Sequence, residues 1–508
     1  MSLVGMPTLV ISVRFLSGVN NKTTKPKLII TNKTIRMTMK RILAIVLTIS
    51  SLGMISVKSV FGQQKLTNKP LPALQQDFVN LGFGMFIHYG MPTFMDQDWS
   101  DPDAPLELFN SPKFDADQWA KAAKSANMTY GCLTTKHHSG FPIWNTKTTD
   151  YNVMHTPFGR DVVKEYADAF RKNGLKVMLY YSILDTHHGI RPNQITPEHI
   201  QMIKDQLTEL LTNYGEITAL IIDGWDAPWS RISYDDVPFE DIYYLIKSLQ
   251  PNCLVMDLNA AKYPSEALFY TDIKSYEQGA GQFISKEHNK LPALACLPLQ
   301  ANWFWKESFP GTSVKDVKEL INDFVIPYNN AYCNFILNVA PNKYGLIDDN
   351  ALEALKEMGE LYQLPESFPV LPTFDAPIIS SNLAKHKKSN SSWSDDMNIM
   401  DFANDDNFGS SWVSNREVKK PWYEITFDKA EAFNTLVITE GRFSNSTYVL
   451  AYFANGNWYP VHTEEIASKS KIKIFRFDRV WGEKVKLTIQ SFERQPAIAE
   501  FGVYNERR

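Results

Sequence analysis

At 508 residues the chain exceeds the size of one ordinary hydrophobic core, so two folded domains are expected. The composition is globular, with 44% hydrophobic and 21% charged residues, which excludes a disordered chain. The first 62 residues hold nine of the 52 basic residues and none of the 56 acidic ones, so the remainder is more acidic than the net charge of -4 indicates. Nucleic acid is therefore not an expected partner, because its phosphates would be repelled.

The leader covers residues 1–62. Within it, Met39-Lys40-Arg41 precedes an apolar run over 42–57. This pattern predicts a secretory signal peptide over 39–62, with the true start at Met37 or Met39. The run is short for a membrane span, and an uncleaved anchor is the alternative. We therefore expect an exported protein, periplasmic or secreted, without a membrane anchor.

Over residues 63–364, apolar strand candidates alternate with amphipathic helical stretches. Repeated βα units build a parallel sheet, and eight of them close a barrel, so the pattern predicts a (β/α)8-like TIM barrel of the α/β class. The sixth and seventh strands are weakly marked and are expected near Leu268 and Leu294. The clearer strands are predicted at 84–88, 130–136, 176–182, 218–223, 254–258 and 335–338, and the helices at 116–126, 162–173, 198–214, 239–249, 314–329 and 350–363.

The helical period stops in a Pro-rich crossing, and residues 365–375 are interpreted as a linker. From 376 to 508, short alternating strands separated by turn residues predict an all-β jelly-roll or β-sandwich domain. Its strands are predicted at 422–427, 435–440, 448–453, 472–477 and 484–489.

The four cysteines lie in the predicted barrel without any C-x-x-C spacing. Each sits in or beside an apolar run, which favours small buried hydrophobic residues over disulfide partners or zinc ligands. No disulfide and no metal site is expected from Cys132, Cys253, Cys296 and Cys333.

Polar residues end four of the clearer strands. In a parallel barrel the carboxyl ends of the strands share one mouth, so reactive side chains gather there. Packing alone does not explain a polar group at so many strand ends. These residues are His88, the pair His137 and His138, Tyr181, and Asp223.

Asp223 is the candidate nucleophile. It ends a buried apolar strand and is followed by Gly224 and Trp225, with Trp229 close behind. Gly relieves crowding beside a ligand, and aromatic rings near a carboxylate suit the apolar face of a sugar. The alternative is an ordinary turn or helix N-cap, a common role for Asp at βα junctions.

His137 and His138 are adjacent at the end of the second predicted strand. Neighbouring side chains on an extended segment point to opposite sides, so the pair is a poor site for one metal ion. We interpret both as hydrogen-bonding partners of sugar hydroxyl groups. A histidine satisfied in the core is the alternative for either one.

A retaining glycosidase needs a second carboxyl group about 5 Å from its nucleophile. This group gives a proton to the leaving oxygen and later takes one from water. Glu277, 54 residues downstream of Asp223, is the candidate acid/base. Asp272, Glu287 and Glu307 are alternatives.

Together these segments resemble glycoside hydrolase family 29, the α-L-fucosidases. Residues 82–90, 135–141, 180–182, 223–225 and 334–341 are similar to family segments in the same order. The resemblance implies a retaining exo-α-L-fucosidase, with Asp223 as nucleophile, that hydrolyses terminal fucosyl residues of oligosaccharides or glycoconjugates without a cofactor. It implies that His88, Trp99 (with Asp98), His137, His138, Tyr181 and Trp225 contact the sugar.

The sequence departs from the family pattern at three places. Ser139 stands where the family usually has Asp, Ile221 replaces a customary Trp, and Leu258-Asn259 occupies the place of a frequent Arg. Two alternative functions follow. One is a catalytically degenerate protein that binds fucose or glycans, and the other is a retaining barrel glycosidase for another sugar, such as an α-galactoside.

The C-terminal segments 402–412, 422–427 and 498–504 resemble a discoidin-like carbohydrate-binding module of the coagulation-factor C type. Such modules often hold a structural calcium ion. The Asp-rich turn at 404–407 is interpreted either as a source of oxygen ligands for calcium or as an ordinary solvated turn.

Overall fold

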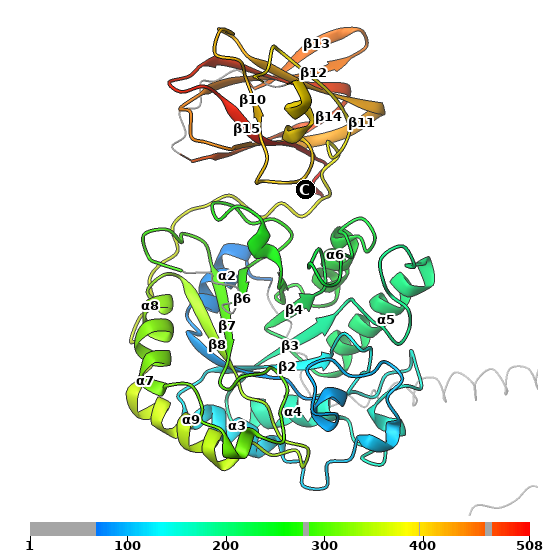
Figure 1. The fold of residues 1–508 in the computed structure, drawn as a ribbon, viewed down its shortest axis with the longest axis vertical. Helices are drawn as coiled ribbons and strands as arrows, with labels where there is room; N and C mark the ends of the chain where they lie inside the picture. Colours follow the sequence, from blue (N-terminus) through cyan, green and yellow to red (C-terminus); the bar gives the residue numbers. More distant parts are fainter. Residues whose placement is uncertain (1–67, 278–283, 396, 463–469, 508) are drawn as a thin grey trace, which may run out of the picture. The chain divides into compact units, whose positions relative to one another are not determined.

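The computed structural model describes residues 68–277, 284–395, 397–462 and 470–507. The predicted leader at 1–62, with its signal peptide at 39–62, lies outside the described residues. The chain forms a parallel barrel followed by an antiparallel β-domain, which confirms the predicted fold class (Figure 1).

Eight parallel strands form the barrel in the order β5-β4-β3-β2-β1-β8-β7-β6. Among the described residues the ladder is interrupted between β5 and β6. There the carboxylate of Asp272 accepts the Val255 N–H at 2.9 Å, and the Asp272 N–H donates to the Val255 carbonyl at 2.8 Å. The strands are β1 (Phe83–Ile87), β2 (Tyr130–Lys136), β3 (Lys176–Ser182), β4 (Ala219–Asp223), β5 (Leu254–Asp257), β6 (Lys274–Glu277), β7 (Ala293–Pro298) and β8 (Cys333–Asn338).

Helices cover the outside of the barrel (Figure 1). Two of them begin at N-cap aspartates: Asp115 accepts the N–H groups of Asp117 and Gln118, and Asp161 accepts that of Lys164. The helices are α3 (Ala116–Ser125), α4 (Val162–Lys172), α5 (Pro197–Asn213), α6 (Phe239–Leu249) and α9 (Asp349–Leu361).

The helix predicted over 314–329 is divided. It consists of α7 (Val317–Glu319), a π-helical segment (Leu320–Val325) and α8 (Ile326–Asn329). Pro327 has no backbone N–H to donate to the preceding turn. The missing donor accounts for the wider hydrogen-bonded turns of the π-helical segment.

The position expected for the sixth strand was wrong. It was expected near Leu268, but residues 258–273 contain a 3-10 turn at Ala260–Lys262 and an isolated β-bridge between Phe269 and Ile378, and β6 begins at Lys274. The sequence of β6 is too polar to be recognised as a strand. Its Lys274 is nevertheless buried, because it donates to the carbonyls of Tyr263 and Pro264. The seventh strand, β7, does contain Leu294.

Helix α2 (Leu71–Val79), which the sequence reading missed, closes the amino-terminal end of the barrel. Its Leu74 and Phe78 join the cluster of inward side chains that fills the barrel. Asn334 of β8 donates to the Phe78 carbonyl at 2.5 Å. With this end filled, a ligand can reach the barrel interior only from the carboxyl ends of the strands.

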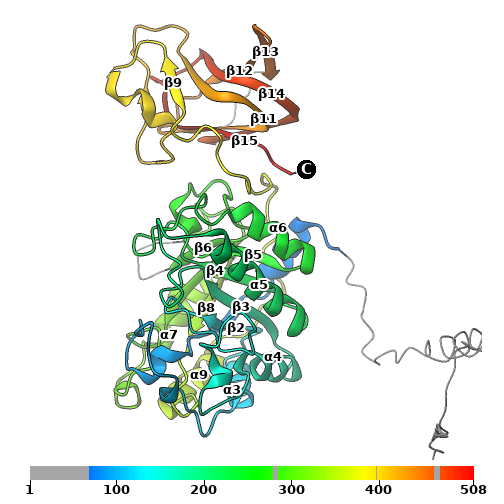
Figure 2. The same ribbon diagram turned by 90° about the vertical axis from the view of Figure 1, so that its right-hand side faces the viewer.

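The C-terminal region is a β-sandwich (Figure 2). Residues 422–427 and 435–440 are two halves of one strand, and so are 472–477 and 484–489. Register shifts between Thr426 and Glu431 and between Phe433 and Thr435 bend the first long strand. Both halves pair with residues 472–488, and on the other side the first half pairs with 388–391 and the second with 498–504. The strands are β9 (Lys388–Ser391), β10 (Trp412–Val413), β11 (Trp422–Glu440), β12 (Thr447–Ala454), β13 (Asn457–His462), β14 (Ile472–Ser491) and β15 (Ala497–Tyr504).

Residues 362–387, between α9 and β9, contain no helix and no strand. This stretch includes the predicted linker at 365–375. The domain limits 63–364 and 376–508 stay predictions.

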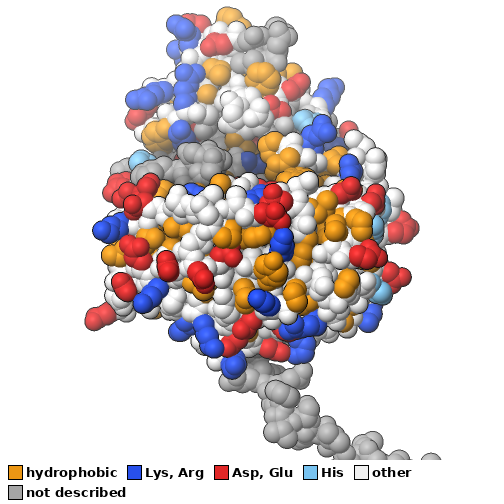
Figure 3. Space-filling model, turned by 60° about the horizontal axis from the view of Figure 1, so that its bottom comes forward, with side chains coloured by type: hydrophobic (Ala, Val, Ile, Leu, Met, Phe, Trp, Pro, Cys, Tyr) orange, Lys and Arg blue, Asp and Glu red, His pale blue; other side chains and the backbone are white. Residues whose placement is uncertain are grey.

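All four cysteines are buried and free. Within the described part of the chain, no helix has the length and apolarity to cross a membrane, and no three His, Cys, Asp or Glu side chains gather as a metal site would require. On the face in Figure 3, acidic and basic side chains are interspersed. In the Asp-rich turn, Asp405 accepts from Asn407 and Ser410.

Candidate active site

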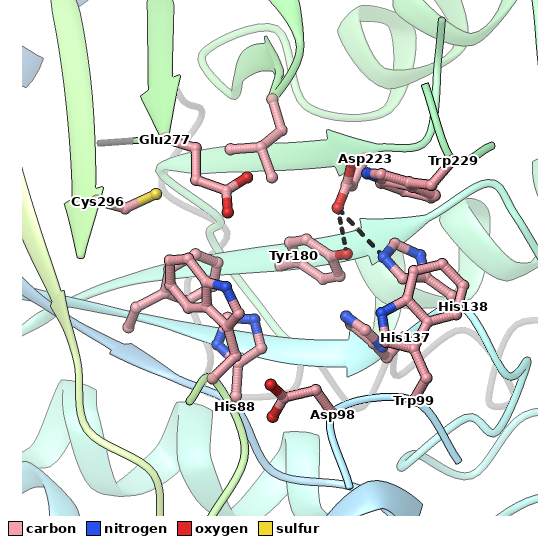
Figure 4. A pocket seen from close by; sticks show the side chains of 13 residues that line it. His88, Asp98, Trp99, His137, His138, Tyr180, Asp223, Trp229, Glu277 and Cys296 are labelled. Atoms are coloured by element: carbon pink, nitrogen blue, oxygen red, sulfur yellow. Dashed lines mark hydrogen bonds and ion pairs between the residues drawn. The ribbon is translucent and has the colours of Figure 1, made fainter. Parts of the chain in front are cut away.

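A hollow of about 580 Å³, including the open space at its mouth, lies at the carboxyl ends of the barrel strands (Figure 4). Its wall is polar and aromatic and holds three carboxyl groups, two from different strands and that of Asp98 from a loop. The lining residues are Phe86, His88, Asp98, Trp99, His137, His138, Tyr180, Asp223, Trp229, Leu258, Glu277, Cys296 and Trp303.

Asp223 ends β4 and points into the hollow (Figure 4). Its Oδ2 accepts the Tyr180 hydroxyl at 2.7 Å, and its Oδ1 accepts the Asn259 amide at 3.1 Å. Burial raises the pKa of Asp223 to about 6, against the two hydrogen bonds, and the nearby charge of Glu277 raises it further. The group is therefore ionised at neutral pH and held by uncharged donors.

Glu277 ends β6 and faces the same hollow as Asp223 (Figure 4). Partial burial raises the pKa of Glu277, while a hydrogen bond with the Trp303 side chain lowers it. A carboxyl group with a raised pKa is suited to hold a proton and release it to a leaving group. Asp223 and Glu277, the two carboxyl groups that the sequence analysis proposed as a pair, thus line the same hollow.

The three alternatives to Glu277 do not line the hollow. Asp272 lies between β5 and β6, where it accepts the Val255 N–H. It also pairs with Lys247 at 2.8 Å and accepts the Tyr243 hydroxyl at 2.9 Å. Glu307 pairs with Lys343 at 2.7 Å on the surface. Glu287 is exposed.

His88 follows β1 and lies in the hollow wall. Its Nδ1 lies 2.7 Å from Oδ1 of Asn338, an oxygen that also accepts the His88 backbone N–H at 3.2 Å. Because that oxygen is an acceptor, Nδ1 carries the proton and Nε2 is left as an acceptor for a ligand hydroxyl. Burial lowers the pKa of His88 to about 4, so the ring is neutral above pH 5.

The prediction that His137 and His138 point to opposite sides was wrong. Strand β2 ends at Lys136, and the chain then turns with Gly140 at a φ of 88°, so both rings line the hollow with centroids 3.9 Å apart. Burial lowers the pKa of both, that of His138 to about 3. Two neutral rings can each offer a donor or an acceptor.

The two histidines differ in their partners. His138 shares a hydrogen bond with the Ser182 hydroxyl at 2.8 Å, and its Nε2 lies 3.7 Å from Oδ2 of Asp223. Nδ1 of His137 is buried without a hydrogen-bonding partner among the described residues. A buried ring nitrogen of this kind has the capacity for one further hydrogen bond.

Aromatic rings form the rim next to His138. The Trp99 ring lies 4.5 Å from the His138 ring and meets the Trp229 ring edge-on at 5.3 Å. Asp98 lies beside them and accepts the Phe304 N–H at 3.1 Å and the Asn302 amide at 3.0 Å. Trp229, which the sequence already indicated as an aromatic residue close to the candidate nucleophile, lies in the wall of the hollow.

Two predicted sugar contacts lie elsewhere. Tyr181 points out of the barrel, where its hydroxyl donates to Gln206 at 2.7 Å and accepts from Lys136 at 3.0 Å. Tyr180 points inward instead, because successive side chains of a strand alternate. Trp225 is fully buried and donates to the Val237 carbonyl at 2.8 Å, so it supports the loop rather than the hollow.

The chain is similar in sequence to known proteins. A family model described as alpha-L-fucosidase matches residues 103–364. Alpha-L-fucosidase 1 of Arabidopsis thaliana is 28% identical over 482 residues, which are 86% of this chain and 88% of the relative. Tissue alpha-L-fucosidase of Homo sapiens is 24% identical over 336 residues, which are 58% of this chain and 68% of the relative.

A solved structure shares the fold. Alpha-L-fucosidase isoenzyme 1 from Paenibacillus thiaminolyticus aligns with a TM-score of 0.50 at 23% identity, covering 83% of this chain and 100% of that chain.

Proposed function

The chain belongs to the α-L-fucosidase family of glycoside hydrolases, and from that premise we propose that it is a retaining exo-α-L-fucosidase with Asp223 as nucleophile and Glu277 as acid/base. One observation carries the assignment: the two carboxyl groups face one sugar-sized hollow from different strands (Figure 4).

In the first step, an ionised oxygen of Asp223 attacks the anomeric carbon of a terminal α-L-fucosyl unit. The bond to the leaving oxygen breaks, and Glu277 transfers its proton to that oxygen. The product is a glycosyl ester of Asp223 and a free alcohol. The hydrogen bond from Tyr180 holds the carboxylate in place for the attack.

In the second step, the ionised Glu277 takes a proton from water as the water oxygen bonds to the anomeric carbon. The ester bond to Asp223 breaks, and fucose leaves with its original configuration. Both carboxyl groups return to their starting protonation states.

The remaining lining supplies recognition. His88, His137 and His138 offer ring nitrogens to sugar hydroxyls, while Phe86 and Trp303 are apolar surface for the C5 methyl group. The hollow ends blindly above the packed barrel interior, which favours one terminal sugar over an internal unit of a chain.

We extend the proposal to the natural setting of the enzyme. Its substrates are fucosylated oligosaccharides or glycoconjugates, and it is exported after cleavage of the peptide at 39–62. The C-terminal sandwich acts as a carbohydrate-binding module. Amino-terminal sequencing of the mature protein tests the cleavage: a start close to residue 63 supports it, and a start at Met37 or Met39 contradicts it.

A panel of aryl glycosides tests the activity. We expect release of the aryl group from the α-L-fucoside, none from the α-D-galactoside, and none from the fucoside with a folded Asp223→Ala variant. Release from the galactoside alone would favour a glycosidase for another sugar. Fucose binding without any release would favour a degenerate binding protein.

A further inference from the structure

Asn259 contacts the nucleophile from outside the sugar hollow. Its side-chain amide donates to Oδ1 of Asp223 at 3.1 Å, opposite the Tyr180 hydroxyl on Oδ2. Asn259 itself does not line the hollow. It therefore acts on the carboxylate and not on the sugar.

The backbone of Asn259 is fixed by the residues before it. The Asn259 N–H donates to Oδ1 of Asp257 at 3.0 Å, and Oδ2 of Asp257 accepts the Tyr234 hydroxyl at 2.5 Å. The Leu258 N–H donates to the Ile222 carbonyl at 2.9 Å, which ties this turn to the strand that carries the nucleophile. These backbone hydrogen bonds hold the Asn259 side-chain amide toward Asp223.

No positive charge lies among the described groups that act on Asp223 near neutral pH. Tyr180 and Asn259 are uncharged donors, and His138 is neutral because burial lowers its pKa to about 3. The remaining titratable neighbours, Asp257, Glu277 and Cys296, are acids. A cation at position 259 would change this balance directly.

Resting on the proposed function, we propose that Asn259 is the positioning residue of the nucleophile: it orients Oδ1 of Asp223, and its uncharged amide contributes to the acidic limit of activity. A carboxylate must be ionised to attack, so activity falls as the pH drops through its titration. A donor without charge preserves less of the ionised form at low pH than a cation would.

Two variants at this position should shift the pH profile of kcat/KM in opposite directions. Asn259→Asp, which is isosteric, replaces the donor with a like charge, so the acidic limit should rise by about one pH unit or more and kcat/KM should fall about 10- to 100-fold. Asn259→Lys supplies a cation, so the acidic limit should fall by about one unit. A merely structural role would not move the limit in both directions.

Asn173→Asp is the matched control. Asn173 also donates its amide to a carboxylate, Asp117, at 2.9 Å, but on the barrel exterior. Its pH profile should coincide with that of the wild type. Thermal melting by circular dichroism checks that each variant is folded, and Asn259→Asp decides the question if Asn259→Lys does not fold.

Unchanged acidic limits in the folded Asn259 variants, or an equal shift in Asn173→Asp, would overturn the inference. The proposed function is judged separately. If the wild type hydrolyses the aryl fucoside and Asp223→Ala does not, the function stands even where the role of Asn259 fails.

Discussion

At the scale of single residues, Asp223 is an ionised group in a buried environment that disfavours charge. It is 5% exposed, and burial raises its pKa from 3.8 to about 6. A raised carboxyl pKa means that the fold disfavours the ionised form, so above pH 6 the charge destabilises the native state. The active site retains this destabilising charge because nucleophilic attack requires the ionised carboxylate.

Replacing this charge should stabilise the protein. We expect Asp223→Asn to raise the free energy of unfolding at pH 7 by roughly 1–3 kcal/mol, because one pKa unit corresponds to about 1.4 kcal/mol. The gain should shrink as the pH falls below 6, where the wild-type group becomes protonated. Urea unfolding at pH 7 and pH 5 measures it.

Asp185→Asn is the matched comparison for that experiment. The Asp185 carboxylate is buried beside Lys136 at 3.1 Å, and this ion pair holds its pKa below the ordinary value. Its substitution should therefore destabilise the protein at pH 7. Equal losses of stability in both variants would contradict the account of Asp223.

The pH dependence of activity should follow the same group. As the pH decreases, kcat/KM for an aryl fucoside should fall tenfold per unit below about pH 6, because Asp223 becomes protonated there. The histidines do not cause this limb, since burial lowers the pKa of His88 to about 4 and that of His138 to about 3. A constant kcat/KM down to pH 4 would contradict it.

At the scale of elements, the barrel sorts side chains by the alternation of its strands. Tyr180 faces inward with Met178, while Tyr181 faces outward into a polar cluster. The sequence could place strand β3 but not choose between two adjacent tyrosines, because both are apolar enough for either face. His137 and His138 show the opposite case, since the strand ends before them and alternation no longer applies.

Other elements were hidden from the sequence for identifiable reasons. β6 contains Lys274 and Glu277, so its apolar content is too low to mark a strand. Strands β11 and β14 each look like two strands, because their bends interrupt the alternation. Long apolar strands such as β2 and β3 were predicted with correct bounds, since all of their residues except Lys176 are buried.

The outward cluster beside β2 and β3 should be a stability element. The Nζ of Lys136 is fully buried and contacts Tyr181, Asp185 and Gln206 at 3.0 to 3.1 Å, joining two strands to helix α5. Lys136→Met leaves Asp185 without its buried cation, and should lower the free energy of unfolding by about 3–5 kcal/mol. Denaturant unfolding checks this.

Lys164→Met is the control for that variant. Lys164 pairs with Asp168 at 2.6 Å on an exposed face of α4, where an ion pair contributes little, so a change below about 1 kcal/mol is expected. If the two lysine variants lose the same stability, the cluster does not have the role given to it.

At the scale of the whole molecule, closure at one end of the barrel determines where chemistry can occur. Helix α2 and the inward side chains fill the amino-terminal end, and the strand ends leave a hollow at the other. The sequence predicted the barrel from its alternating strands and helices, and it predicted the position of the site because polar residues follow the apolar strands. It could not predict the separation of the two carboxyl groups, which depends on how β4 and β6 are arranged around the barrel.

Covalent trapping tests the central claim most directly. The protein is incubated with 2-deoxy-2-fluoro-α-L-fucosyl fluoride, whose good leaving group and slowed second step allow the glycosyl ester to accumulate, and its peptides are then analysed by mass spectrometry. The account predicts one fluorofucosyl group on Asp223, and none in Asp223→Ala. An adduct on another residue, or none together with release of fucose of inverted configuration, would contradict it.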